Sequence, residues 1–201
     1  MKYSFFALIS RLKNITRWSL MRNSASENVQ EHSHMVAVIA HALAVIRRDV
    51  FGGAAEPGQT AAAALFHDAS EIFTGDMPTP VKYFDPEIRS AYQRVESVSS
   101  RKLLSALPAE LRPAYEELLS PAFDGPAGEN DIRRLVKAAD RLAAYIKCLE
   151  ELKTGNLEFK SAAQQSKEKL SSLKMPEVDY FIERFIPAFE LTLDELDFTI
   201  V

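Results

Sequence analysis

Apolar residues recur at spacings of three and four along most of this chain, and that period matches an α-helix with one buried face. The segment 28–48 shows the pattern most clearly. Its apolar positions in this register are Val29, Val36, Ile39, Leu43 and Ile46. No stretch shows the strict alternation of apolar and polar residues that is typical of a half-buried strand. The sequence therefore predicts an all-α fold, a compact helical bundle of roughly eight helices.

Breaks in this periodicity fall at glycine and proline, which end helices and favour turns. The predicted helices cover residues 3–13, 28–48, 57–73, 85–105, 108–120, 129–153, 156–173 and 176–190. A polar, irregular segment over 14–27 separates the first two. Loops are expected over 74–81, where Gly75 and two prolines occur, and around 121–128, which is rich in proline and glycine.

The length of 201 residues and the hydrophobic content of 47% suit one globular domain with a substantial core. We therefore expect a single domain over 1–201. The net charge of −4 gives the chain no general attraction to a polyanion. A nucleic-acid polymer is accordingly excluded as a partner, whereas a small anionic substrate needs only local positive charge.

Two further features bear on location. The apolar run over 5–9 is too short to span a membrane, Arg11 follows it, and no small-residue cleavage site comes after it. We interpret it as an amphipathic first helix, not as a signal peptide or membrane anchor. Cys148 is the only cysteine, so no intramolecular disulfide can form, which indicates a cytoplasmic protein. Its apolar helical surroundings favour a buried structural thiol over a nucleophile.

His32 is the first polar residue that falls on an apolar helix face. It is in register with Val29 and Val36, so its side chain is predicted to point inward. An imidazole without a partner in that position would cost a few kcal/mol. Taken alone, a core histidine that is hydrogen-bonded to a carbonyl explains this position most simply.

His67 and Asp68 follow one another near the end of the predicted helix 57–73. Their side chains would point about 100° apart, so both could reach one ion that lies between them. Glu71 comes four residues after His67 and three after Asp68, which places it on the same helix face. The alternative, a solvated helix end, is disfavoured by the apolar residues on both sides of the motif.

Asp140 lies in the middle of the predicted helix 129–153, on or beside its apolar face. A half-buried aspartate in a helix interior is disfavoured unless it has a partner. A salt bridge to Arg133 or Arg141 would provide one. The other explanation is a site that Asp140 shares with the two motifs above.

Such a site would contain two imidazoles and two carboxylates, from His32, His67, Asp68 and Asp140. Nitrogen and oxygen donors suit Mn, Co, Fe, Ni, Zn or Mg and not copper(I) or an iron–sulfur cluster. Four protein ligands leave coordination positions for water, and water bound to such an ion is a nucleophile at neutral pH. The same ion can polarise a phosphoryl oxygen.

The order His…His-Asp…Asp on separate helices resembles the pattern of the HD-domain metal-dependent phosphohydrolases. The surrounding segments resemble the bacterial 5′-deoxynucleotidase family more specifically, and the similarity extends through nearly the whole chain. The segments concerned are 17–22, 27–33, 67–71, 74–84 and 137–140. No ligand position departs from the family pattern.

This resemblance implies an HD-type helical bundle and an enzyme that removes the 5′-phosphate from 2′-deoxyribonucleoside monophosphates while sparing ribonucleotides. It also implies a homodimer and one divalent metal ion, Co, Mn or similar. Arg17 would orient the phosphate, and Trp18 would press on the sugar where a 2′-hydroxyl would lie. Glu71 would lie beside the attacking water as an acid–base or orienting group, so Glu71, Arg17 and Asp68 are the catalytic candidates.

The substrate pocket that the resemblance implies combines residues from several segments. It consists of Arg17, Trp18, Asp68, Asp76, Met77, Pro78, Thr79 and Asp140. A guanidinium binds phosphate through forked hydrogen bonds, and prolines stiffen the loop that carries them. Lys82 could add positive charge. Without the resemblance, Arg17 would be interpreted as a solvated loop residue, and Trp18 equally well as an anchor of its loop in the core.

Three other functions stay open at this point. The chain could hydrolyse another small nucleotide, it could be a non-catalytic HD module that binds nucleotide or metal, or it could be a plain helical scaffold. Few basic residues near the motifs disfavour the first, and the complete ligand set disfavours the second. A scaffold would leave His32, Asp68 and Asp140 half-buried without a shared reason.

The apolar residues near the C-terminus also allow two interpretations. Phe181, Phe185, Ile186 and Phe189 could pack inside the domain or against a second chain.

Overall fold

The computed structural model describes residues 2–82, 84–119 and 131–196, without the side chain of Thr79. Within these ranges the regular structure is helical, and the only β pairing is an isolated bridge between Thr16 and Asn28. The predicted all-α fold is therefore confirmed. The predicted loop around 121–128 lies outside the described residues. No helix in the described part is long and apolar enough to cross a membrane.

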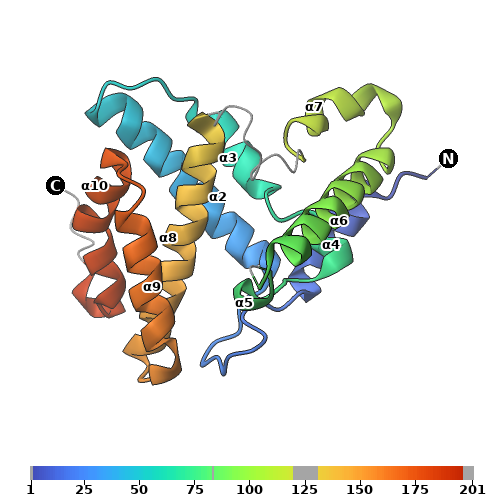
Figure 1. Cartoon of the computed structure of the whole chain (residues 1–201). Helices are drawn as coiled ribbons and strands as arrows, with labels where there is room; N and C mark the ends of the chain where they lie inside the picture. Colours follow the sequence, from blue (N-terminus) through green and yellow to red (C-terminus); the bar gives the residue numbers. More distant parts are fainter. Residues whose placement is uncertain (1, 83, 120–130, 197–201) are drawn as a thin grey trace.

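The larger core forms around two long helices, α2 (Val29–Val45) and α8 (Asp131–Lys153), which pack against each other (Figure 1). Three further helices cover them: α3 (Pro57–Leu65), α9 (Lys160–Ser171) and α10 (Pro176–Arg184). The side chains at the centre are almost fully buried. They include Val36, Leu43, Leu135, Leu142 and Cys148. The prediction of a buried structural Cys148 is confirmed.

A second, smaller core lies on the other side of α2 in Figure 1. It joins α1 (Phe5–Ile9) and α4 (Glu71–Thr74) to α6 (Pro86–Ser105) and α7 (Arg112–Glu116). Its buried residues are Phe5, Ala69, Leu103, Leu107 and Leu119. The chain passes from the larger core to the smaller one at the end of α3, which is where the candidate site residues His67 and Asp68 occur.

The starts of two long helices are fixed by their own side chains. Asn28 caps α2 in a capping box with Glu31: its side chain accepts from the backbone N–H of Glu31, and the Glu31 carboxylate accepts from the N–H of Asn28. Asp85 caps α6, where Pro86 follows it at the first helical position. The cap at Asn28 matters for the site because α2 carries His32 in its first turns.

The prediction of one helix over 57–73 is wrong. Residues 66–70 form turns, and α4 begins only at Glu71. The carbonyl of Ala64 explains the break: it accepts from the ring Nδ1 of His67 at 2.7 Å and from the backbone N–H of His67 at 3.4 Å. In a continuing α-helix this carbonyl would bond the N–H of Asp68. The side chain of His67 therefore competes with the helix and ends it.

Other predicted boundaries are close but not identical. The loop expected over 74–81 includes one helical turn, α5 (Thr79–Lys82). Several helices continue as tighter or wider turns: 3₁₀ segments at Ser10–Asn14, Ala109–Leu111, Leu157–Phe159, Ile186–Glu190 and Leu193–Glu195, and a π-turn at Ile46–Val50. Near the C-terminus Phe181 and Ile186 pack inside the larger core, while Phe185 is 46% exposed.

Candidate metal centre and substrate pocket

His32 lies at the meeting point of the two cores. Its side chain is fully buried, as the helical register predicted. Its Nε2 is 3.0 Å from Oδ1 of Asp140 on α8 and 3.7 Å from Oδ2 of Asp68. Asp140 thus has an imidazole as its partner, and a salt bridge to Arg133 or Arg141 is not needed to explain its position.

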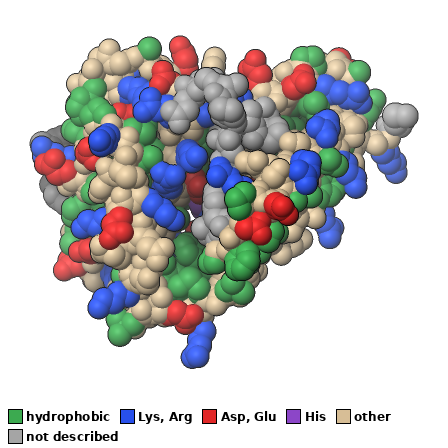
Figure 2. Space-filling view, in the orientation of Figure 1, with side chains coloured by type: hydrophobic (Ala, Val, Ile, Leu, Met, Phe, Trp, Pro, Cys, Tyr) green, Lys and Arg blue, Asp and Glu red, His purple; other side chains and the backbone are tan. Residues whose placement is uncertain are grey.

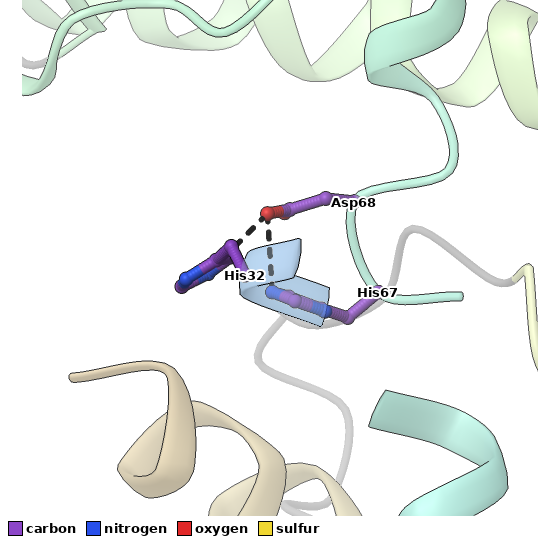
Figure 3. Close-up of side chains that lie close together, drawn as sticks. All are labelled: His32, His67 and Asp68. Carbon is purple, nitrogen blue, oxygen red and sulfur yellow. Dashed lines mark ion pairs between the residues drawn. The ribbon is translucent and has the colours of Figure 1, made fainter. Parts of the chain in front are cut away.

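His67 and Asp68 lie in the turn between α3 and α4, not on a helix. Their side chains still converge, because Nε2 of His67 is 3.1 Å from Oδ2 of Asp68. Figure 3 shows the Asp68 carboxylate pointing toward both imidazoles. One ligand atom from each of His32, His67 and Asp68 lies within 4.8 Å of the others, a spacing that could hold a metal ion. Oδ1 of Asp140 is 4.0 Å from Nε2 of His67.

The hydrogen bond that ends α3 also sets the chemistry of His67. Because Nδ1 donates to the Ala64 carbonyl, the neutral ring has no proton on Nε2. This Nε2 is buried and has no hydrogen-bond partner among the described residues. An imidazole with one nitrogen fixed by a carbonyl and the other unprotonated is the usual form of a histidine metal ligand. The residues present therefore fit a divalent ion.

The charges at this point favour a cation. Burial lowers the pKa of His67, but Asp68 and Asp140 oppose it and raise that pKa to about 9. Burial also raises the pKa of the Asp68 carboxyl, yet His67, His32 and Arg17 hold it well below its usual range. The pKa of Asp140 is lowered as well, against the effect of burial, chiefly by His32. Two carboxylates thus stay ionised beside imidazoles that can share a positive charge or a metal ion.

Arg17 and Trp18 are brought to the same place by the irregular segment before α2. Nη1 of Arg17 is 3.4 Å from Oδ2 of Asp68 and 4.0 Å from Oδ1 of Asp76. Its side chain is only 12% exposed, so the solvated-loop interpretation is wrong. Burial lowers the pKa of Arg17, but the surrounding carboxylates raise it further, so the guanidinium stays charged. A buried, permanently charged guanidinium is suited to bind a phosphate.

Trp18 is half-buried and packs against Phe159, with ring centroids 5.3 Å apart. Its indole N–H donates to Glu27 at 3.0 Å. Trp18 therefore anchors its segment in the larger core while remaining next to Arg17. Anchoring and contact with a sugar are not exclusive, because one face of an indole can pack against protein while the other contacts a ligand.

Glu71 is the first residue of α4, and its backbone N–H donates to the carbonyl of Asp68 at 3.0 Å. One of its carboxylate oxygens, Oε2, is buried and has no hydrogen-bond partner in the described part of the chain. Burial, together with the charges of Asp68 and Asp76, raises the pKa of Glu71 to about 10. Strongly perturbed carboxyl groups of this kind are frequent in active sites.

Asp76 joins the cluster through Arg17. Burial raises its pKa, and Asp68 adds to that effect, while Arg17 and a backbone hydrogen bond from Trp18 oppose it. Met77 and Pro78 follow directly and are half-buried. The side chain of Thr79 lies outside the described part. The contact of Met77, Pro78 and Thr79 with a nucleotide stays a prediction.

The sequence interpretation missed two features that hold these residues. Glu27 accepts from both Arg17 and Trp18. The buried ion pair between Lys147 and Glu151 on α8 binds the backbone of Ser24 and Ala25. The i, i+4 spacing of Lys147 and Glu151 predicts an ion pair, but it cannot predict what the pair binds. Glu27 follows no periodic pattern in its segment.

The surface above the site is hollowed. Figure 2 shows a recess near the centre of this face, with Lys and Arg side chains around it and acidic and histidine side chains at its base. Lys82, which contacts Glu96 at 3.0 Å, contributes positive charge near Glu71. The combination suits a small anion better than a long polyanion, since the overall charge is −4.

Comparisons with known proteins show which family and fold the chain resembles. A family model described as 5′-deoxynucleotidase YfbR-like matches residues 4–189. A protein named 5′-deoxynucleotidase YfbR from Shigella dysenteriae is 48% identical over 192 residues, which cover 96% of this chain and 94% of that protein.

Solved structures resemble the fold over nearly the same extent. An HD-domain phosphohydrolase from Listeria innocua has a TM-score of 0.79 and 27% identity, and the match covers 92% of this chain and 88% of that one. The HD phosphohydrolase DatZ of cyanophage S-2L, described as bound to dA and one catalytic Zn²⁺ ion, has a TM-score of 0.63 and 20% identity. That match covers 93% of this chain and 99% of the phage protein, and it supports the fold.

Proposed function

Since the chain belongs to the YfbR-like family of 5′-deoxynucleotidases, we propose that it hydrolyses 2′-deoxyribonucleoside 5′-monophosphates to a deoxynucleoside and phosphate. One observation carries the proposal: Asp68 lies within ion-pair distance of both candidate ligand histidines and of Arg17. A site for a metal ion and a site for a phosphate thus share one carboxylate. Water would attack phosphorus, and the bond from phosphorus to the 5′-oxygen would break.

His32, His67, Asp68 and Asp140 are proposed to hold one divalent ion. When bound, the ion would supply a water of lowered pKa and positive charge for the phosphoryl oxygens. Support comes from the bond of His67 Nδ1 to the Ala64 carbonyl, which leaves Nε2 as the nitrogen that can bind an ion, and from the ionised carboxylates around it. Co, Mn or Zn each suit two imidazoles and two carboxylates; the Zn²⁺ named for the phage enzyme is one of these.

Two residues are proposed to act on the substrate phosphate from the protein side. Arg17 would bind its oxygens through the guanidinium, which is already buried and charged before substrate binds. Glu71 would lie beside the attacking water as an acid–base or orienting group. Its raised pKa supports this role, because in the metal-free protein it retains a proton at neutral pH.

Selection against ribonucleotides is proposed for Trp18. Adjacent Cα atoms are about 3.8 Å apart, so a residue next to the phosphate-binding Arg17 lies close to the sugar. A rigid indole near C2′ would leave no volume for a hydroxyl group and offer it no acceptor. Asp76, Met77, Pro78 and Thr79 are proposed to complete the pocket, with Asp68 and Asp140 at its base.

A homodimer, a cytoplasmic location and a single domain over 1–201 are further proposals. The dimer rests on the family resemblance, and light scattering of the purified protein measures it. The cytoplasmic location rests on the single cysteine. Limited proteolysis tests the single domain, because two independent domains would yield two stable fragments.

The decisive experiment is phosphate release from paired deoxy- and ribonucleoside 5′-monophosphates. The protein is stripped with a chelator and then supplied separately with Co²⁺, Mn²⁺ or Zn²⁺. We expect release from deoxynucleotides that depends on added metal and is lost in Asp140→Asn. His34→Ala is a matched control, because His34 is exposed on the same helix as His32. Release that is unaffected by chelation, or no release with any of the three metals, would contradict the proposal.

A further inference from the structure

One oxygen of Glu27 joins the two residues proposed to recognise phosphate and sugar. Oε2 of Glu27 accepts from Nε of Arg17 at 3.1 Å and from the indole Nε1 of Trp18 at 3.0 Å. The Glu27 side chain is 17% exposed, so solvent screens these bonds little. A carboxylate that accepts from a guanidinium forms a charge-assisted hydrogen bond, which is stronger and more directional than a neutral one.

The backbone around Glu27 holds the same two segments together. The N–H of Arg17 donates to the carbonyl of Glu27 at 2.9 Å, and the N–H of Val29 donates to the carbonyl of Ile15 at 3.0 Å. Glu27 directly precedes Asn28, the N-cap of α2, which carries His32. Glu27 is therefore fixed to the same helix as a candidate metal ligand, and it transmits that fixed position to Arg17 and Trp18.

The backbone conformation of Trp18 indicates that surrounding contacts hold the residue in place. Its φ of 58° lies in the left-handed region, which is rare for a bulky residue and costs about 1 kcal/mol or more. Such a conformation persists only where surrounding contacts determine it. Its contacts include the bonds that its carbonyl accepts from Met21 and Asn23, the backbone hydrogen bond from Trp18 to Asp76, the packing on Phe159, and the indole bond to Glu27.

Among these contacts, only the bond to Glu27 acts on the polar edge of the indole. Packing on Phe159 restrains the ring, whereas the bond to Glu27 fixes the direction of its N–H. The same oxygen that orients the indole also restrains Nε of Arg17, so the two side chains cannot shift independently. Among the described residues, Nη2 of Arg17 has no hydrogen-bond partner, and it remains available for a ligand.

We propose that Glu27 is a positioning residue that fixes Arg17 and Trp18 relative to one another, so that phosphate binding and sugar selection operate as one unit. It does not touch the substrate. This inference rests on the proposed function for its kinetic consequence, but its geometric part does not. The indole orientation can be measured without any substrate.

The geometric test uses intrinsic fluorescence, because Trp18 is the only tryptophan. We compare the emission maximum and acrylamide quenching of the wild type, Glu27→Gln and Glu27→Ala. Glu183→Gln is the control, since it removes a carboxylate that is 73% exposed on α10. We expect faster quenching and a shifted emission in Glu27→Ala, a smaller change in Glu27→Gln, which keeps one acceptor oxygen, and none in the control. Unchanged fluorescence in Glu27→Ala would overturn the proposal.

The kinetic test measures kcat/KM for dAMP and AMP in the same proteins. We expect Glu27→Ala to lower the dAMP to AMP ratio by roughly 10-fold, the size that loss of one hydrogen bond to a charged group predicts. In a Trp18→Ala background the same change should leave the ratio unaltered, because the indole it orients is absent. An equal loss on both substrates, or additive effects in the double variant, would overturn the proposal.

The two tests separate this inference from the proposed function. Far-ultraviolet circular dichroism tests whether each variant is folded. If Glu27→Ala does not fold, Glu27→Gln is used for both tests in its place. If the wild type hydrolysed no deoxynucleotide but the fluorescence changed as expected, the proposed function would fail while the positioning of Trp18 by Glu27 would stand. If the wild type were selective but substitution of Glu27 changed neither the fluorescence of Trp18 nor the dAMP to AMP ratio, only the positioning role would fail.

Discussion

Nη1 of Arg17 lies 3.4 Å from Oδ2 of Asp68, the same oxygen that approaches Nε2 of His67 at 3.1 Å. One carboxylate oxygen of Asp68 therefore contacts both the proposed phosphate-binding residue Arg17 and the proposed metal ligand His67. A metal ion that binds Asp68 competes with Arg17 for that oxygen, so metal occupancy should weaken the hold of Asp68 on the guanidinium. Metal binding and phosphate binding are thus expected to be thermodynamically coupled through Asp68.

The first prediction concerns the ligands. His67→Ala or Asp68→Ala should abolish bound metal and phosphatase activity together, because each removes a group at the centre of the cluster. Elemental analysis of the purified variants measures the metal, with His34→Ala as the control. Wild-type metal content in either variant would show that the ion binds elsewhere.

The second prediction concerns Glu71. Glu71→Ala should retain the metal and still bind nucleotide, yet its kcat should fall by about 10²–10⁴, as is typical when a positioned acid–base group is lost. Single-turnover kinetics with dAMP measure the chemical step, and titration calorimetry measures binding. A kcat near that of the wild type would make Glu71 a bystander despite its raised pKa.

The third prediction concerns sugar selection. Trp18→Ala should raise kcat/KM for AMP relative to dAMP, because the volume near C2′ becomes available to a hydroxyl group. Arg17→Ala should slow both nucleotides alike, since both carry the same phosphate. A displacement of the reacting phosphorus by about 1 Å costs on the order of 10² in rate, which sets the scale of discrimination. Equal turnover of dAMP and AMP by the wild type would refute the role given to Trp18.

The fourth prediction concerns the Lys147–Glu151 pair. Burial raises the pKa of Glu151, but Lys147, the N–H groups of Ser24 and Ala25, and Asn156 lower it to about 2, against an ordinary value of 4.5. Because the folded pKa is the lower one, the unfolded chain binds more protons in acid. The stabilisation is complete above about pH 4.5 and is lost as the pH falls toward about 2.

Urea unfolding at several pH values tests this assignment. Glu151→Gln should lower the free energy of unfolding by about 3 kcal/mol at neutral pH, because it leaves the buried Lys147 ammonium without its charge partner. The difference from the wild type should shrink below about pH 4.5. Glu183→Gln, which removes an exposed carboxylate, should show no such difference at any pH. A deficit in Glu151→Gln that stayed constant down to pH 3 would contradict the linkage.

Much of the fold was predictable because its signals are local. Periodic apolar residues predicted the long helices α2, α6 and α8, and the inward position of His32 followed from its register alone. The break after Leu65 was not predictable in this way, because residues 57–73 have a continuous helical pattern. What ends the helix is one side-chain bond, from His67 to the carbonyl of Ala64, and periodicity does not report such a bond.

The candidate site, like the fold, was predictable only where the signals are local in sequence. The four proposed ligands could be identified from residue type and register, and the structure brings them together; their role as ligands stays a prediction. Glu27 and the Lys147–Glu151 pair could not be identified, because their partners lie in an irregular segment whose path is set by long-range contacts. Glu151, for example, binds the backbone of Ser24 across 127 positions of sequence.

The left-handed backbone at Trp18 has a consequence for how this chain could change over generations. Glycine would adopt that conformation without cost, so the backbone alone would favour its replacement. A lineage that replaced Trp18 by glycine would relieve the backbone but would lose the packing on Phe159 and the indole bond to Glu27, which anchor the segment. Trp18 thus combines a local conformational penalty with contacts that offset it, and a substitution there changes both together.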